Sequence, residues 1–315
     1  MIVDLEQTSF YIPYLEGQLH LRQVKLANAD MHKPPILMLH GAMSNGKVFY
    51  SESGRGLACF LAEAGFVVYV LDTQGRGLST PKIQRGFKEG QGEVIREQLP
   101  LVHHYIMGLH SQVSSIHWCA HSWGGVLMAS AISRFPLFQE SVASLLTFGT
   151  KRTIKVSSVK KYMMVNIGWN KLAKVIAWGH GYLAADSWGM GMDNESRRSL
   201  SQCVDWVRGD WIDHDDGFDY AQAAQVVASK EKWPKSWFIA GLGDEVLGNP
   251  ADVQRMIQEC QFSNVEYTLL AKSQGHKHDY GHAEMLIHKD AVDDHFIQVR
   301  DWYKNIELSE AKALV

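Results

Sequence analysis

The chain has 315 residues, of which 46% are hydrophobic, and a formal net charge of −3 at pH 7. This length suits one large α/β domain with an insertion, or two modest domains, and the hydrophobic fraction supplies a substantial core. The near-neutral charge, without any block rich in Lys or Arg, gives no electrostatic case for a nucleic-acid partner.

The start of the chain and its cysteines indicate a cytoplasmic protein. The N-terminal stretch has no apolar run long enough for a signal peptide, and no run in the chain approaches the ~18 apolar residues of a membrane span. The scattered cysteines, Cys59, Cys119, Cys203 and Cys260, have no CxxC spacing and mostly lie among apolar residues. We therefore expect reduced core cysteines, no bound metal and no stable membrane insertion; the sequence specifies no oligomeric state.

The first half of the chain alternates predicted strands and helices. Two antiparallel strands, 8–13 and 19–26, surround Gly17. A fully apolar run, Ile36–Leu39, then has the character of a strand buried on both faces, as in a parallel sheet. The remaining elements of this half are a helix ending at Gly65, a strand over 66–71, a helix near 93–110, a strand reaching Ala120, a helix from Val126 to near Pro136, and a strand over 142–148. This alternation predicts a doubly wound parallel sheet.

The pattern changes in the middle of the chain and then returns. Residues 150–232 are helix-like and lack a convincing strand, which predicts a helical cap inserted between strands of a core formed by 1–149 and 233–315. Strands near 236–240 and 265–270, with helices near 250–260 and 292–303, complete the core. The expected cap is rich in aromatic and thioether side chains, namely Trp169, Trp178, Trp188, Trp206, Trp211, Met163, Met164, Met190 and Met192. These side chains either line an apolar acyl pocket or form the core of the cap.

A short stretch around Ser122 has the pattern of a nucleophile elbow. An apolar strand reaches Ala120, and a helix-forming segment begins directly after Gly125. The chain must therefore turn sharply, with Ser122 at the apex and a helix N-terminus behind it. Ser122 is the candidate nucleophile; the alternative is a serine that caps a buried helix.

A serine hydroxyl needs a base and an orienting acid, and both are expected at the carboxyl ends of strands. Asp244 follows a buried strand in a glycine-bearing turn and is the candidate acid, with Glu245 as the fallback. Three histidines follow the last strand. We favour His282, which follows a glycine and precedes an apolar segment, over His276, and expect His278 to be exposed.

Two backbone amides are expected to bind an oxyanion. One belongs to Trp123, directly after the candidate nucleophile, and the other to Ala42, which follows His40-Gly41. Met43 is the alternative donor and a candidate substrate-binding residue. Losing one such donor typically costs about 3 kcal/mol of transition-state stabilisation.

Five motifs together resemble the α/β-hydrolase superfamily. They are His40-Gly41, Asp72-x-x-Gly75-x-Gly77-x-Ser79, the Ser122 elbow, Gly241-x-Gly243-Asp244 and Gly281-His282. The resemblance implies an eight-stranded, mainly parallel sheet with helices on both faces and the site under the cap. It is greatest for the lipase/esterase-like branch, through Ser-Gly-Arg-Gly-Leu-Ala at 53–58 and Leu-Ala-Glu-Ala-Gly-Phe at 61–66. The elbow departs from the commonest form at Ala120.

These features predict a serine hydrolase that cleaves a small-molecule carboxylic ester, with a hydrophobic acyl group and without a cofactor. Thioesterase, amidase and acyltransferase activity use the same acyl-enzyme and stay open, as does a ligand receptor that keeps the pocket without turnover. Gly75-Arg76-Gly77 lacks the third glycine of a dinucleotide fingerprint. The acidic segment 210–219 lacks the register of a calcium loop and is interpreted as a solvated turn.

Overall fold

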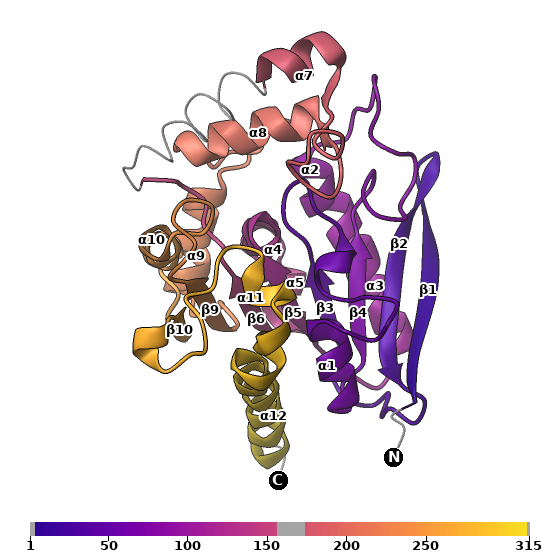
Figure 1. Cartoon of the computed structure of the whole chain (residues 1–315), viewed down its shortest axis with the longest axis vertical. Coiled ribbons are helices and arrows are strands. Elements are labelled where there is room, and N and C mark those ends of the chain that lie inside the picture. The colour runs from indigo at the N-terminus through magenta and orange to yellow at the C-terminus, as the bar shows by residue number, and fades with distance from the viewer. Residues whose placement is uncertain (1–3, 156–173, 314–315) are drawn as a thin grey trace.

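The computed structural model describes residues 4–155 and 174–313. Within these ranges a central sheet has the strand order β1-β2-β4-β3-β5-β6-β9-β10 (Figure 1). The strands are β1 Leu5–Tyr14, β2 Gly17–Leu26, β3 Ile36–Leu39, β4 Val68–Asp72, β5 Ile116–His121, β6 Val142–Phe148, β9 Lys235–Gly241 and β10 Val265–Leu270. β2 pairs antiparallel with β1 and β4, and every other pairing is parallel. The predicted eight-stranded, mainly parallel sheet is confirmed.

Helices cover both faces of this sheet. They are α1 Leu57–Glu63, α2 Gln91–Glu93, α3 Leu99–Leu109, α4 Trp123–Arg134, α5 Pro136–Ser141, α7 Lys174–His180, α8 Arg197–Arg208, α9 Tyr220–Ser229, α10 Pro250–Cys260, α11 Glu284–Ile287 and α12 His295–Ala313. One apolar cluster joins the sheet to α3, α4, α9 and α10, and a second joins its other face to α1 and α12. A short π-helical turn, Val94–Gln98, links α2 to α3.

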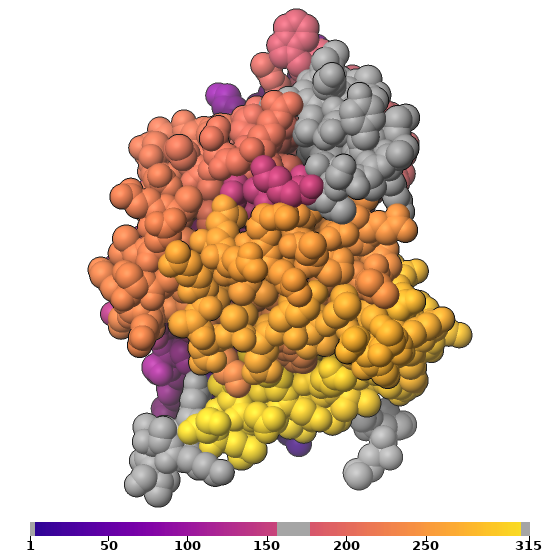
Figure 2. All heavy atoms as spheres, turned by 90° about the vertical axis from the view of Figure 1, so that its left-hand side faces the viewer, coloured from indigo at the N-terminus to yellow at the C-terminus, as the bar shows by residue number. Residues whose placement is uncertain are grey.

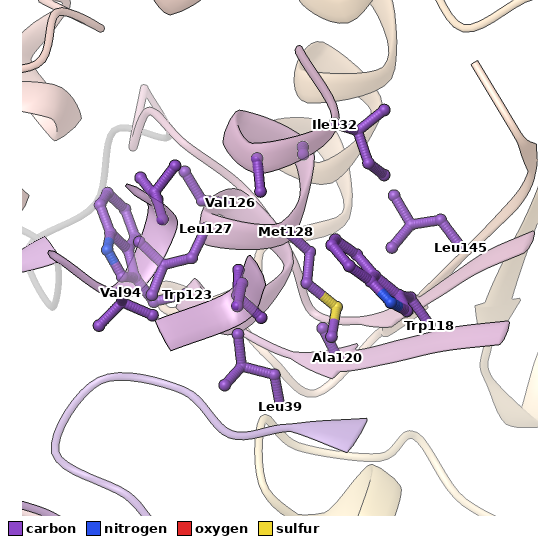
Figure 3. Close-up of a cluster of buried hydrophobic side chains, with 14 of the residues drawn as sticks. Leu39, Val94, Trp118, Ala120, Trp123, Val126, Leu127, Met128, Ile132 and Leu145 are labelled. Atoms are coloured by element: carbon purple, nitrogen blue, oxygen red, sulfur yellow. The ribbon is translucent and has the colours of Figure 1, made fainter. Parts of the chain in front are cut away.

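The apolar strands divide their side chains between these two clusters. On β5, Ile116, Trp118 and Ala120 belong to the cluster with α4, whereas Cys119 belongs to the cluster with α12. Successive residues of a strand point to opposite faces, so a continuous apolar run is what a strand between two helical layers requires. Figure 3 shows Trp118 and Ala120 of β5 beside Met128 of α4. This packing fixes the end of β5, where the candidate nucleophile follows.

The segment expected to be a cap enters the structure between β6 and β9, which are neighbours in the sheet. In Figure 1, α7 and α8 lie above the sheet, whereas α9 packs against α4 and α10 of the core. Figure 2 shows the inserted segment (salmon) resting on the residues of the C-terminal core (orange). A small antiparallel ladder, β7 Tyr182–Leu183 with β8 Glu195–Ser196, stands between α7 and α8. The limits of the cap stay a prediction, and Met163, Met164 and Trp169 lie outside the described residues.

Two expectations drawn from composition bear on the environment of the chain. All four cysteines are free and buried. In the part of the chain that the structure describes, none of the helices combines the length and the apolar character needed to cross a bilayer. The predicted cytoplasmic location stays a prediction.

Candidate active site

Ser122 lies at a sharp turn between β5, which ends at His121, and α4, which begins at Trp123. Its backbone has φ 53° and ψ −122°, a conformation that residues with a side chain rarely adopt. Such strain persists only where the surrounding packing imposes it. The consequence is that the Ser122 hydroxyl projects beyond the end of the sheet at the N-terminus of a helix.

Two glycines allow this turn to sit close to its neighbours. A Cβ on Gly124 would lie 2.5 Å from the carbonyl oxygen of His40, and a Cβ on Gly125 would overlap the Thr150 hydroxyl. That hydroxyl donates a hydrogen bond of 2.8 Å to the carbonyl oxygen of Ser122. The loop after β3 and the loop after β6 therefore clamp the elbow from two sides.

The structure brings together the three side chains selected from the sequence. Nε2 of His282 lies 2.8 Å from Oγ of Ser122, and Nδ1 of the same ring lies 2.5 Å from Oδ2 of Asp244. We call Ser122, His282 and Asp244 the elbow trio. Their catalytic roles stay a prediction, but the hydrogen bonds have the order that a nucleophile, a base and an orienting acid require.

The alternative residues are engaged elsewhere or exposed. His276 lies 2.8 Å from Asp294 through Nδ1, and His278 lies 2.7 Å from Asp290 through Nε2. Glu245 is exposed, in contrast to Asp244, which is 4% exposed.

The loops that carry the acid and the base are joined by their backbones. The amide of Gly243 donates to the carbonyl oxygen of Tyr280 at 3.1 Å. A Cβ on Gly241 would overlap the same carbonyl group, so only glycine allows β9 to end this close to the loop that carries the histidine. The separation between His282 and Asp244 is thus fixed by main-chain contacts, as well as by the hydrogen bond between the side chains.

The surroundings of Asp244 favour its ionised form. Burial by itself raises the pKa of this carboxyl group, but hydrogen bonds from His282 and from the Gly248 amide, with the nearby charge of Lys151, outweigh burial. The pKa of Asp244 therefore lies below its ordinary value. Lys151 is itself buried, and burial lowers its pKa. An ionised Asp244 accepts from the imidazole and fixes which ring nitrogen carries the proton.

His121 also contributes to the site and was not selected from the sequence. Its Nε2 lies 3.1 Å from the carbonyl oxygen of His282, and the two ring centroids are 4.7 Å apart. Burial lowers the pKa of His121 to about 3, so near neutral pH the ring is uncharged and its Nε2–H donates to the carbonyl. The position directly before the nucleophile on β5 was the signal available in the sequence. His121 therefore holds the backbone of the candidate base.

The two expected oxyanion amides belong to Ala42, after β3, and Trp123, at the start of α4. Within the described residues, neither amide nitrogen donates a hydrogen bond to another protein group. Met43 has φ 51°, and its carbonyl oxygen accepts from the amides of Met192 and Asp193. Met43 thus joins this loop to the inserted segment; its predicted roles in oxyanion and substrate binding are untested.

A small pocket lies beside Ala42 and Trp123. Figure 3 shows Trp123, Leu127 and Val94 together at the start of α4, and these three side chains form the apolar part of the wall with Ile83 and Phe87. The rest of the lining is mainly polar or backbone: His40, Gly41, Thr73, Gln74, Arg76, Glu89, Gly90, Gln91, Gln98, Glu195, Ser196 and Ser199. The pocket is therefore more polar than the sequence led us to expect.

The described tryptophans and methionines of the inserted segment do not line this pocket. Trp206 and Trp211 are buried in the apolar cluster with α4, which is the core interpretation. The other four are exposed: Trp178, Trp188, Met190 and Met192. Of the two interpretations left open by the sequence, the lining of an acyl pocket does not hold for these described residues at this cavity.

The acidic segment 210–219 is also different from expectation, because Asp213 is only 1% exposed. Tyr220 donates to its carboxylate at 2.7 Å, and Arg96 and Arg134 form ion pairs with it. The interpretation as a solvated turn is wrong for Asp213. A buried carboxylate paired with two guanidinium groups instead ties this segment to the core.

One cluster among the described residues has the composition of a metal site. Ligand atoms of His278, His288 and Asp290 lie within 4.8 Å of one another. The groups already bond to each other, since the Asp290 amide donates to Nδ1 of His288 at 3.2 Å and its carboxylate pairs with His278. This cluster is separate from the hydrogen bonds of the elbow trio.

Comparison with known proteins identifies the fold. Residues 34–185 match the family model described as the alpha/beta hydrolase fold. No curated protein matches the chain in sequence. Similar solved structures include a monoglyceride lipase from Saccharomyces cerevisiae (14% identity, TM-score 0.67, covering 95% of this chain and 96% of that one).

Other similar structures have different activities. An esterase from Thermogutta terrifontis has 12% identity and a TM-score of 0.57, with 96% of this chain and 99% of that chain covered. A haloalkane dehalogenase from Bradyrhizobium elkani has 17% identity and a TM-score of 0.59, with 96% and 100% covered. Identities this low establish the fold and leave the reaction open. The strand order, the family match and these neighbours show that the chain has the α/β-hydrolase fold.

Proposed function

We propose that this protein is a serine hydrolase that cleaves carboxylic esters through an acyl-enzyme. The observation that carries the proposal is the hydrogen-bonded elbow trio, with the Ser122 hydroxyl 2.8 Å from His282 Nε2. Esterases and lipases among the structural neighbours support the same class.

In the proposed reaction, His282 Nε2 takes the proton of the Ser122 hydroxyl as its oxygen attacks the ester carbonyl carbon. The tetrahedral oxyanion accepts hydrogen bonds from the amides of Ala42 and Trp123. Asp244 keeps the proton of the neutral ring on Nδ1 and stabilises the charged imidazolium.

The imidazolium then gives its Nε2 proton to the departing alkoxide oxygen, which leaves as the alcohol, and an acyl-Ser122 ester forms. Water attacks this ester with His282 again acting as the base, and the acid and free serine result. Thioesters and amides would follow the same two steps with a different leaving group.

Two measurements test the proposal. A fluorophosphonate probe should label the native protein at Ser122 and leave Ser122→Ala unlabelled. A panel of p-nitrophenyl esters from acetate to palmitate should show hydrolysis by the native protein and a loss of about 10⁴-fold or more in kcat for Ser122→Ala.

Ser9→Ala provides a matched control, because Ser9 also hydrogen-bonds a histidine, His20. Equal labelling of the native protein and Ser122→Ala would contradict the proposal. Ligand-induced shifts in melting temperature without labelling or turnover would instead support a receptor on the same fold.

A further inference from the structure

The pocket beside the two oxyanion amides is lined by two glutamine side chains whose amide oxygens have no hydrogen-bond partner in the part of the chain that the structure describes. Gln91 and Gln74 line it and are 2% and 6% exposed. The Oε1 atoms of both side chains are buried without a hydrogen-bond partner. Burying an amide oxygen without a partner destabilises the protein, and a hydrogen bond from a ligand donor would remove that cost.

The orientation of Gln91 is fixed by its other contacts. Its Nε2 donates to the Ser199 carbonyl oxygen at 2.9 Å, and its backbone amide donates to Gln202 Oε1 at 2.7 Å. Rotating the side-chain amide by half a turn would set two oxygens against each other. Oε1 of Gln91 is therefore the atom left to accept.

Gln74, which also lines the pocket, is held in a similar way. Its backbone amide donates to Gln98 Oε1 at 3.0 Å, and its Nε2 contacts the Thr80 carbonyl oxygen at 3.5 Å. The second unsatisfied acceptor of the wall is thus also a carbonyl-type oxygen.

The charged side chains of the pocket wall do not favour binding of an ionic ligand group. Arg76 is 6% exposed and forms a salt bridge of 2.5 Å with Glu195, which also lines the pocket. Burial raises the pKa of Glu89, and the neighbouring Glu93 and Glu97 raise it further. A neutral group that donates hydrogen bonds fits such a wall better than an alkyl chain or a carboxylate.

We propose that the acyl group held in this pocket carries a hydroxyl, so that the preferred substrates are esters of hydroxy acids. The inference rests on the proposed ester hydrolysis and adds the chemistry of the acyl group. The hydroxyl donates to Gln91 Oε1 or Gln74 Oε1, while Leu127 and Val94 contact its carbon chain. An alkyl acyl group leaves both buried oxygens without a partner, which is the basis of discrimination.

Matched esters test this inference, because a methyl group has nearly the shape of a hydroxyl. We expect kcat/KM to be about tenfold or more higher for p-nitrophenyl 3-hydroxybutyrate than for p-nitrophenyl 3-methylbutyrate. The same difference is expected between the p-nitrophenyl esters of 6-hydroxyhexanoate and heptanoate. Gln91→Met or Gln74→Met should reduce that ratio to about twofold. Gln139→Met is the matched control, since Gln139 also donates from Nε2 to a carbonyl oxygen, that of Ile132, outside this pocket.

A binding measurement separates failure of this inference from failure of the proposed function. By calorimetry, Ser122→Ala protein should bind 3-hydroxybutyrate about tenfold tighter than 3-methylbutyrate. Selective binding without turnover of any ester by the native protein would remove the proposed reaction and keep the assignment of the pocket. If the native protein hydrolysed both esters of each matched pair at equal rates, the assignment of the pocket would be wrong and the proposed reaction would stand. The same conclusion would follow if the kcat/KM ratio within a pair were unchanged in Gln91→Met and Gln74→Met.

Discussion

The molecule contains a second hydrogen-bonded set of serine, histidine and aspartate, far from the elbow in the sequence. Ser9 Oγ lies 2.8 Å from His20 Nε2, and His20 Nδ1 lies 2.8 Å from Asp72 Oδ2. We call these residues the strand trio. Its distances match those of the elbow trio to within a few tenths of an ångström, so hydrogen-bond geometry alone does not distinguish the two.

The electrostatic surroundings of the acid do not distinguish them either. Burial raises the pKa of Asp72, as it does for Asp244, and in both cases the hydrogen bond from the histidine and other contacts outweigh it. The pKa of each carboxyl group lies below its ordinary value. A lowered pKa at a buried aspartate therefore accompanies structural pairs as well as candidate catalytic ones.

What differs is the backbone around each serine. Ser9 lies within the regular ladder of β1 and β2, whereas Ser122 has positive φ at the N-terminus of α4. Asp72 also accepts from the backbone amides of Gly46 and Leu78, so its carboxylate joins two loops. The comparison teaches that the strained turn and the nearby amides, rather than the three side chains, mark the candidate reactive serine.

The largest expected effect separates the two serines directly. Ser122→Ala should lower kcat for a p-nitrophenyl ester by about 10⁴-fold or more, because the nucleophile is lost. Ser9→Ala should change kcat by less than about twofold. Steady-state kinetics on both variants, with circular dichroism to verify folding, checks this. Similar losses in the two variants would show that the comparison is wrong.

The two aspartates should differ in which property they affect. Asp244→Asn should lower kcat by about 10³–10⁴-fold with little change in melting temperature, because the amide favours the wrong ring tautomer. Asp72→Asn should instead lower the free energy of unfolding by about 2 kcal/mol, since a buried acceptor of two backbone amides is weakened. Kinetics and urea denaturation of both variants measure the two effects; a purely structural Asp244 would appear as lost stability with kcat retained.

His121 allows the positioning of the base to be tested. His121→Phe should lower kcat by about tenfold with KM nearly unchanged, because the hydrogen bond to the His282 carbonyl is lost and the ring can shift. His121→Gln keeps a donor and should recover much of kcat. A pH–rate profile whose acid limb moves in His121→Phe and returns in His121→Gln would assign the effect to the base; an equal kcat in all three proteins would exclude this role.

The smallest effect per residue concerns histidines that pair with no carboxylate among residues 4–155 and 174–313. Burial lowers the pKa of His103, His117 and His295 to about 4. The unfolded chain takes up these protons near pH 6.5, so the stabilisation is complete above that pH and is lost as pH falls toward 4. We expect the free energy of unfolding to fall by about 4 kcal/mol or more between pH 7 and pH 5, as measured by urea denaturation.

A variant pair identifies the source of that pH dependence. His117→Gln should make the free energy of unfolding fall less steeply with falling pH. The substitution removes one group that takes up a proton in the unfolded chain but not in the folded protein. His32→Gln, at an exposed position, should leave the slope unchanged. If the free energy of unfolding depended on pH equally in all three proteins, the buried histidines would not be its source.

Local sequence patterns were sufficient for most of the fold. Buried parallel strands such as Ile36–Leu39 were predicted because an apolar run must lie between two helical layers. The elbow was predicted because small residues around Ser122 allow a strand to turn directly into a helix. Asp244 and His282 were selected because each follows the end of a strand, and carboxyl ends of parallel strands meet at one edge.

The remaining features depend on contacts between segments that are distant in the sequence. Asp213 is buried because it forms ion pairs with Arg96 and Arg134, which belong to other elements. The polar character of the pocket was decided by Gln74 and Gln91, whose partners lie on several segments. Hydrophobic periodicity reports which face of an element is buried, but the partners of a buried polar group depend on how the elements pack. For this reason the sequence by itself determined the sheet and the candidate residues at its edge, and only the tertiary structure decided what surrounds them.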